Sequence, residues 1–224
     1  EVELLGENVS AWTQPRRARA GLGRSYQRNT IFPSFTVLEN CRLSAQARLQ
    51  QPWAWWRNAQ ADGPALTAGR TAAERVGLGH MLERQAGLLS HGQKRQLEIA
   101  MCLATAPRVL LLDEPLAGMG AEETERMLQL LLDLKQDHAL LLVEHDMDAV
   151  FRLADRISVL VYGHIIASDT PEEIRRRYPS PMDSMYRSGR VACARKSPAS
   201  AWARMPNRDS RRSCASAKGS TTVI

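Results

Sequence analysis

The sequence predicts an α/β fold in which helices cover both faces of a mostly parallel sheet, with a helical subdomain attached. Two continuous apolar runs, 109–112 and 139–143, are typical of strands buried on both faces. A helical pattern follows each run, and this alternation of strand and helix favours a parallel sheet. An Ala-rich, mostly helical region that continues to about Leu88 predicts the subdomain.

Composition sets limits on the class of protein. A chain of 224 residues with 44% hydrophobic content can bury one sizeable core. No apolar run reaches the roughly 18 residues of a membrane-spanning helix. The four cysteines are single and scattered, which favours a reducing cytosol and gives no support for metal binding; they are Cys41, Cys102, Cys193 and Cys214.

The net charge of +6 belongs to one end of the chain. From Arg175 onward there are 12 Lys and Arg against two Asp, so the preceding body is mildly acidic. From about Tyr178 the composition is rich in Ser, Arg, Ala, Pro and Gly without an apolar period, which predicts a disordered tail. A shifted reading frame would also explain this composition.

Local signals place the remaining elements in chain order. A basic helical stub precedes a short strand that ends in a polar loop at Gln27, and three tryptophans fall within 53–56. Ser90 and Gln93 fit a capping box. The other expected elements are helices over 36–50, 90–105, 121–135 and 147–154, a hairpin over 156–168 that turns at Gly163, and a helix that begins at Thr170.

Chemistry-bearing residues follow the two buried strands. Asp113 and Glu114 end the first strand, and His145 follows the second. Carboxylates at a strand end of an α/β sheet face the crevice where ligands bind. One acid can hold Mg²⁺ while the other activates a water molecule. A simple strand-to-turn boundary and a surface histidine would explain the same residues.

The segment Ser90-His91-Gly92-Gln93 is also compatible with an anion site. A helix N-terminus that carries a glycine and free backbone N–H groups attracts a phosphate. A plain helix cap is the alternative, and the two interpretations are compatible because a phosphate can complete the cap.

In order, these features resemble the ATP-binding subunits of ABC transporters. Gly21–Gln27 resembles the Q-loop, Leu89–Gln93 the L-S-G-G-Q motif, and Val109–Glu114 the Walker B motif, while His145 is similar to the switch histidine. The resemblance covers about residues 1–177. Three further segments resemble the branched-chain amino-acid uptake subgroup, namely Phe35–Asn40, Arg95–Ala100 and Leu116–Met119.

The resemblance implies a P-loop NTPase-like fold with ATP and Mg²⁺ as cofactors and a role for each matching residue. Gln27 and Asp113 would hold Mg²⁺, Glu114 would be the general base, and His145 would hold the γ-phosphate. Ser90, Gly92 and Gln93 would bind the ATP of a second ATP-binding subunit.

The resemblance also implies a domain order and partners. We expect a partial nucleotide-binding core with the Q-loop over 1–40, a helical subdomain over 41–88 that contacts transmembrane permease subunits, the rest of the core over 89–177, and the basic tail over 178–224. A substrate-binding protein would act indirectly, and the location would be the cytoplasmic face of the plasma membrane.

The family's phosphate loop, G-x-x-x-x-G-K-[ST], occurs nowhere in the 224 residues. Because the chain starts at Glu1 rather than Met, we expect an N-terminally truncated copy that neither binds ATP tightly nor hydrolyses it alone. The alternatives are a non-catalytic half-site donor, an importer subunit for another solute such as urea or a lipid, and an ABC-type ATPase that acts on nucleic acid. The last is disfavoured because the chain has neither a coiled-coil insertion nor a second cassette.

Overall fold

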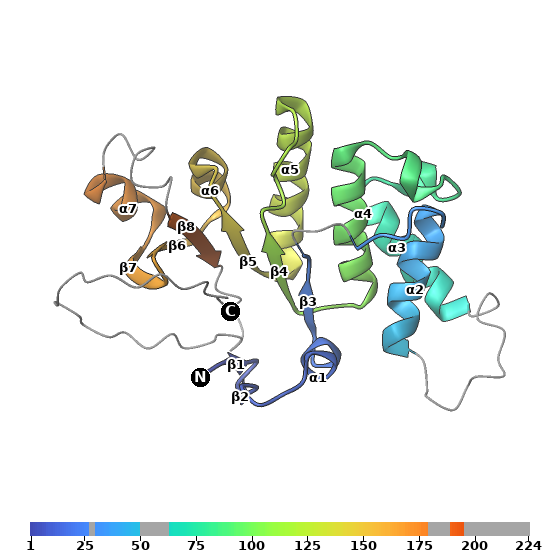
Figure 1. Cartoon of the computed structure of the whole chain (residues 1–224), viewed down its shortest axis with the longest axis horizontal. Helices are drawn as coiled ribbons and strands as arrows, with labels where there is room; N and C mark the ends of the chain where they lie inside the picture. The colour runs from blue at the N-terminus through green and yellow to red at the C-terminus, as the bar shows by residue number, and fades with distance from the viewer. Residues whose placement is uncertain (27–29, 50–62, 179–188, 195–224) are drawn as a thin grey trace.

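The computed structural model describes residues 1–26, 30–49, 63–178 and 189–194. A six-stranded sheet occupies the middle of the molecule (Figure 1), with the strand order β3-β4-β5-β8-β6-β7. These strands are β3 (Leu22–Arg24), β4 (Val109–Asp113), β5 (Ala139–Glu144), β6 (Arg156–Val161), β7 (His164–Asp169) and β8 (Gly189–Ala194).

The three strands β3, β4 and β5 form the parallel part of the sheet. Their register aligns Arg24 with Leu111 and Asp113 with Val143, so the strands end along one edge. The predicted α/β fold class is confirmed, as are the two buried strands. The predicted hairpin is also present, because β6 and β7 pair in antiparallel fashion around Tyr162 and Gly163.

The core lies between this sheet and the helices that follow its strands. Helix α5 (Ala121–Asp137) follows β4, and helix α6 (Met147–Leu153) follows β5. Alternate residues of β4, Leu110 and Leu112, are buried in the same core cluster as an apolar stripe on α5. The buried residues of that stripe are Met127, Leu128, Leu130, Leu131 and Leu134. Leu132, on the same helix, is only partly buried.

Three helices pack together on one side of the sheet, at the right of Figure 1. They are α2 (Val37–Leu49), α3 (Gly63–Arg75) and α4 (His91–Ala104), with short 3-10 turns at η2 (Gly79–Met81) and η3 (Ala86–Leu88). Gly69 permits a close crossing of α2 and α3, because a Cβ atom there would lie 2.8 Å from the Arg42 backbone nitrogen. The segment 53–56, with its three tryptophans, lies outside the described residues.

The two ends of the described core add small elements. At the start, β1 (Glu3–Leu4) and β2 (Glu7–Asn8), each two residues long, form a hairpin that was not predicted from the sequence. Helix α1 (Gln14–Arg19) follows it. Helix α7 (Pro171–Arg177) begins as predicted, since the Thr170 side chain accepts the backbone N–H of Glu173.

The structure differs from the predicted disordered tail at one place. Residues 189–194 form β8, which pairs with β5 on one side and β6 on the other. Backbone hydrogen bonds to two neighbouring strands supply the ordering energy that the tail's composition lacks. The rest of the tail, 179–188 and 195–224, lies outside the described residues. Of the helices described, none has the length and apolarity needed to cross a membrane.

Candidate functional site

Residues at the ends of β4 and β5 come together at the carboxyl edge of the sheet. The backbone N–H of Glu114 donates to the Val143 carbonyl at 2.8 Å, which joins the two strand ends. His145 Nδ1 lies 4.0 Å from Glu114 Oε1 and 3.9 Å from Glu144 Oε2. Glu114 has a φ of 48°, an uncommon left-handed backbone conformation for a residue with a side chain. Sequence reasoning therefore placed Asp113, Glu114 and His145 on the same edge correctly.

Asp113 has the features of a metal-ligating carboxylate. Its backbone N–H faces the buried Ser25 hydroxyl at 3.4 Å, while its Oδ1 atom is buried and accepts no hydrogen bond from any described residue. A buried carboxylate oxygen without a donor suits a cation. Within the described ranges, no three His, Cys, Asp or Glu side chains form a metal-binding group. One carboxylate beside substrate phosphates suits Mg²⁺, which keeps much of its water shell.

Glu144 is a residue of this edge that sequence reasoning missed. Its carboxylate is buried and accepts the backbone N–H of Leu116 at 2.9 Å and of His145 at 3.2 Å. Burial raises the pKa of Glu144, although these two N–H groups and His145 oppose that rise. The available signal was the alternation along β5, where Leu140, Leu142 and Glu144 share the buried face.

The N-terminus of α4 carries the predicted capping box. Ser90 Oγ accepts the Gln93 backbone N–H at 3.2 Å, and Gln93 Oε1 accepts the Ser90 backbone N–H at 3.0 Å. Gly92 in the first turn is buried. The hydroxyl proton of Ser90 is donated to Glu123 Oε1 at 3.0 Å, so a carboxylate lies at this helix end.

One segment connects the α4 N-terminus with the carboxyl edge of the sheet. Residues 114–123 start at Glu114 and end in the first turn of α5. His91 Nε2 lies 3.1 Å from the Ala117 carbonyl, and its ring packs on Gly118, whose φ is 74°. The segment is thus held by Glu144 at one end and by residues of α4 at the other.

Gln27 lies outside the described residues, so its predicted contact with Mg²⁺ stays a prediction. The residue before it is fixed to α4, because Arg95 donates from Nη1 to the Tyr26 carbonyl at 3.4 Å. Arg95 also forms a buried ion pair with Glu98 at 2.9 Å. The end of this polar loop is therefore coupled to the same helix that carries Ser90.

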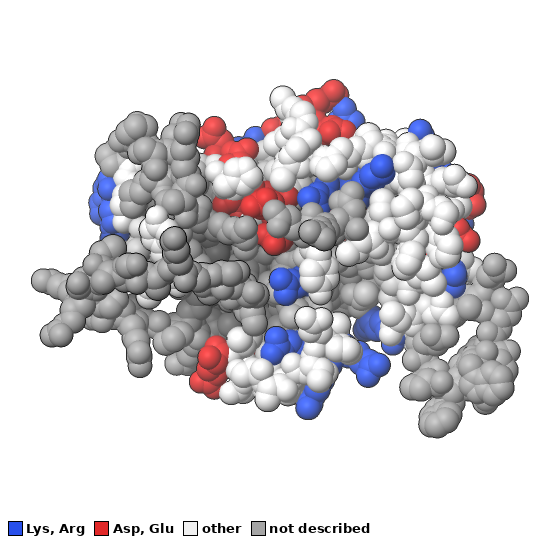
Figure 2. All heavy atoms as spheres, viewed as in Figure 1, with Lys and Arg blue, Asp and Glu red and all other residues white. Residues whose placement is uncertain are grey.

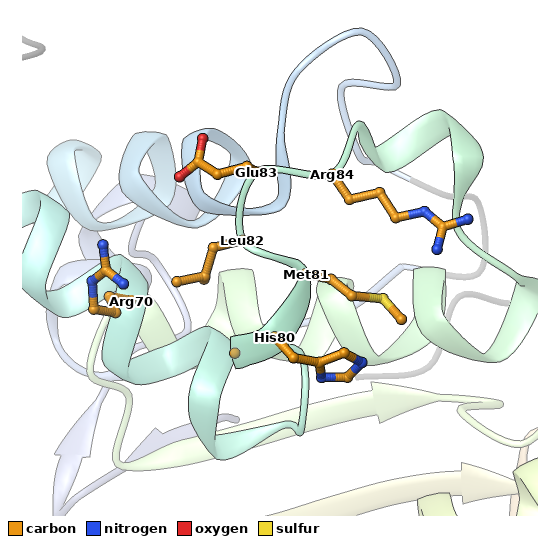
Figure 3. A pocket seen from close by; sticks show the side chains of 7 residues that line it. Arg70, His80, Met81, Leu82, Glu83 and Arg84 are labelled. Carbon is orange, nitrogen blue, oxygen red and sulfur yellow. The ribbon is translucent and has the colours of Figure 1, made fainter.

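The described surface has two further features. Figure 2 shows acidic atoms gathered at the centre of one face and around the top of α5. A separate surface pocket of about 510 Å³ lies in the helical part of the chain. Its lining side chains are drawn in Figure 3. None of its lining residues belongs to the carboxyl edge; they are Arg70, Gly79, His80, Met81, Leu82, Glu83 and Arg84.

Comparison with solved structures defines the class of protein. A structure of MJ1267, an ATP-binding cassette of an ABC transporter, superposes with a TM-score of 0.69 at 25% identity, covering 81% of this chain and 74% of that chain. The fold is therefore that of an ATP-binding cassette.

The chain belongs to the ABC transporter family, whose sequence profile matches residues 1–117. The high-affinity branched-chain amino acid transport ATP-binding protein LivG of Salmonella typhimurium is 39% identical over 167 residues, covering 70% of this chain and 65% of that protein. BraF of Pseudomonas aeruginosa, which has the same description, is 34% identical over 184 residues, covering 78% of this chain and 71% of BraF. The family resemblance predicted from the motifs is confirmed, and the chain spans about 65% of the length of LivG.

Proposed function

We propose that this chain is an ATP-binding, ATP-hydrolysing subunit of an importer for branched-chain amino acids. The observation that carries the proposal is that Asp113, Glu114 and His145 converge on one edge, while residues 114–123 connect that edge to Ser90 and Gly92. The chain would thus contribute to two nucleotide sites: the carboxyl edge to its own site, and the N-terminus of α4 to the site of a second subunit. The LivG and BraF relatives supply the solute class.

Each residue has a role that its environment supports. Glu114 is the general base, because it lies at the strand end beside His145. Asp113 holds Mg²⁺ through its donor-free buried oxygen, together with Gln27. Mg²⁺, when bound, neutralises phosphate charge. His145 is exposed at the same edge and holds the γ-phosphate.

Ser90, Gly92 and Gln93 serve the ATP held by a second subunit. They lie at the N-terminus of α4, where a hydroxyl and first-turn N–H groups favour an anion. Because the 224 residues contain no phosphate loop, we propose that the chain alone does not turn over ATP and donates this half-site to a partner cassette. The functional unit is then a dimer with a second ATP-binding subunit, and that subunit must supply the phosphate loop.

The permease contact is proposed for the surface next to the Q-loop. Phe32, Phe35 and Leu88 are large apolar residues that stay exposed there, and the two phenylalanine rings lie 5.5 Å apart. The Gly87 N–H donates to the Pro33 carbonyl at 2.8 Å, which brings the two segments together. An apolar patch of this kind suits a protein partner. Docking on permease subunits, which themselves receive a substrate-binding protein, places the chain at the cytoplasmic face of the plasma membrane.

Hydrolysis by a two-component mixture tests the proposal. The second component is a branched-chain-type cassette that has an intact phosphate loop and a serine-to-alanine change in its own L-S-G-G-Q motif. We expect no ATPase activity from the present chain alone and restored activity in the mixture. Ser90→Ala should abolish the restoration. Glu114→Gln should leave the restored activity unchanged. Glu114 belongs to the present chain's own nucleotide site, whereas the ATP hydrolysed in the mixture is held by the second component.

Two results would count against the proposal. One is Glu114-dependent hydrolysis by the isolated 224-residue chain, which would mean that its own site is complete. The other is restoration that survives Ser90→Ala. Retention of the chain on RNA or DNA that decreases with added salt would instead favour the nucleic-acid alternative.

A further inference from the structure

Glu123 places a carboxylate against the phosphate-binding end of α4. Its Oε1 atom accepts the Ser90 hydroxyl proton at 3.0 Å. A Cβ atom built on Gly92 would lie 2.8 Å from the Glu123 carboxyl carbon and 2.8 and 3.1 Å from its two oxygens. The carboxylate therefore covers the first turn of α4, and glycine at position 92 is what allows this approach.

This contact uses the groups that an incoming phosphate needs. The Ser90 hydroxyl has one proton, which goes to Glu123, and one of its two lone pairs accepts the Gln93 N–H. A carboxylate resembles a phosphate in charge and in its acceptor oxygens, so either anion is stabilised at a helix N-terminus. Both cannot bind there together, because like charges at contact distance repel.

We propose that Glu123 is an internal competitor for the ATP phosphate at Ser90–Gln93: its carboxylate occupies the phosphate position and must leave before the partner's ATP can bind. This inference rests on the proposed function of Ser90–Gln93. Glu123 thereby sets how readily the subunit engages a partner that carries ATP.

The neighbours of Glu123 leave it able to move. Glu122 pairs with Arg126 and Glu125 pairs with Arg152, whereas no Lys or Arg in the described part of the chain forms a salt bridge with Glu123. Among the described residues, displacing the Glu123 side chain therefore breaks one hydrogen bond to a hydroxyl and no ion pair. The backbone of α5 need not move.

The two-component hydrolysis assay tests this competition when the concentration of the present chain is varied. Glu123→Gln keeps the side-chain shape and removes the charge, so we expect half-maximal activity at about fivefold lower chain concentration. Glu122→Gln is the matched control, since it removes the same charge from the same helical turn, and it should leave the midpoint unchanged. Glu123→Ala, which also removes the acceptor of the Ser90 proton, should shift the midpoint at least as far.

A direct measurement on the chain alone uses inorganic phosphate as the probe. Titration followed through the backbone N–H resonance of Gly92 should give about fivefold tighter binding for Glu123→Gln than for Glu122→Gln. A thermal melt of each variant establishes that it is folded.

The outcomes distinguish the competitor role of Glu123 from the proposed function of Ser90–Gln93. If Ser90→Ala abolishes restored hydrolysis but Glu123→Gln matches Glu122→Gln in both assays, the competitor role is wrong and the proposed function stands. If Ser90→Ala has no effect, the half-site itself is wrong. Weaker engagement by Glu123→Gln would overturn the competitor role, because Glu123 would then assist binding.

Discussion

The Glu144 carboxylate accepts the backbone N–H of Leu116 at 2.9 Å, across the gap between two neighbouring strand ends. Its second oxygen accepts the N–H of His145 at 3.2 Å. One buried side chain thus fixes the backbone that follows Glu114 and the backbone that carries His145. The distance between the proposed general base and the proposed phosphate-binding histidine depends on a residue that takes part in neither role.

Replacing Glu144 by alanine should destabilise the chain. The change leaves the Leu116 and His145 N–H groups without their acceptor, so we expect the free energy of unfolding to fall by about 2 kcal/mol. Glu144→Gln keeps an acceptor for only one of the two N–H groups, so it should cost about half as much, roughly 1 kcal/mol. Urea unfolding measures both changes, with Glu7→Ala at an exposed position as the control. Equal stability of Glu144→Ala and the wild type would contradict the bonding described.

The raised pKa of Glu144 predicts that the stability difference between Glu144→Gln and the wild type depends on pH. The folded chain binds this proton more tightly than the unfolded chain, so the stabilisation is present below the ordinary pKa and is lost as pH rises through the folded value. Glu144→Gln cannot ionise. Its stability relative to the wild type should therefore increase as pH is raised from about 4 toward 7.

His138 should make the fold sensitive to mild acid. Burial, and next the charge of Arg75, lower the pKa of His138, whose Nδ1 bonds the Pro107 carbonyl at 3.1 Å. The unfolded chain then binds the proton more tightly, so the free energy of unfolding should decrease as pH falls below about 6.5. His138→Asn should flatten this dependence between about pH 7.5 and 5.5, whereas His80→Asn at an exposed position should not. An unchanged slope in His138→Asn would show that another group is responsible.

Loss of the Ser90 cap should have a modest structural cost. Ser90→Ala removes the acceptor of the Gln93 N–H at the start of α4, and we expect a loss of about 1 kcal/mol in urea unfolding. Ser44→Ala, within helix α2, is the control and should cost little. A loss for Ser90→Ala far above this value would mean that its effect on hydrolysis reflects unfolding.

Gly69 should be intolerant of a side chain. An alanine Cβ there would lie 2.8 Å from the Arg42 backbone nitrogen, which cannot swing away, so Gly69→Ala should destabilise by about 1–3 kcal/mol. Gly63→Ala, at the first residue of the same helix, meets no atom within 4 Å and should be about neutral. Thermal or urea unfolding of the two variants gives the comparison. Similar results for both would contradict the close crossing of α2 and α3.

The sequence predicted those parts of the fold that depend on local pattern. The buried runs at 109–112 and 139–143, the capping box at Ser90 and the helix start at Thr170 all appear in the structure. Strand ends of a parallel sheet meet at one edge, so the grouping of Glu114 with His145 also followed. The family was evident because the order of four motifs is far more specific than any one of them.

What the sequence did not predict depends on contacts between distant residues. The bond from Ser90 to Glu123 spans 33 positions, and that from Leu116 to Glu144 spans 28. Both carboxylates resemble ordinary helix-start or strand-end residues until the fold brings a donor to them. The β1–β2 hairpin was missed because its two-residue strands are too short for any period.

Among the described strands, β8 is the single connection between the two parts of the sheet. Strands β5 and β6 do not pair with each other, so the hydrogen bonds that unite the parallel strands with the β6–β7 hairpin all pass through six residues, 189–194. If those residues detached, two open edges would be exposed at once, one on each neighbouring strand. Unpaired edges are templates for pairing with other chains. The strand that closes this sheet therefore also protects the protein from aggregation.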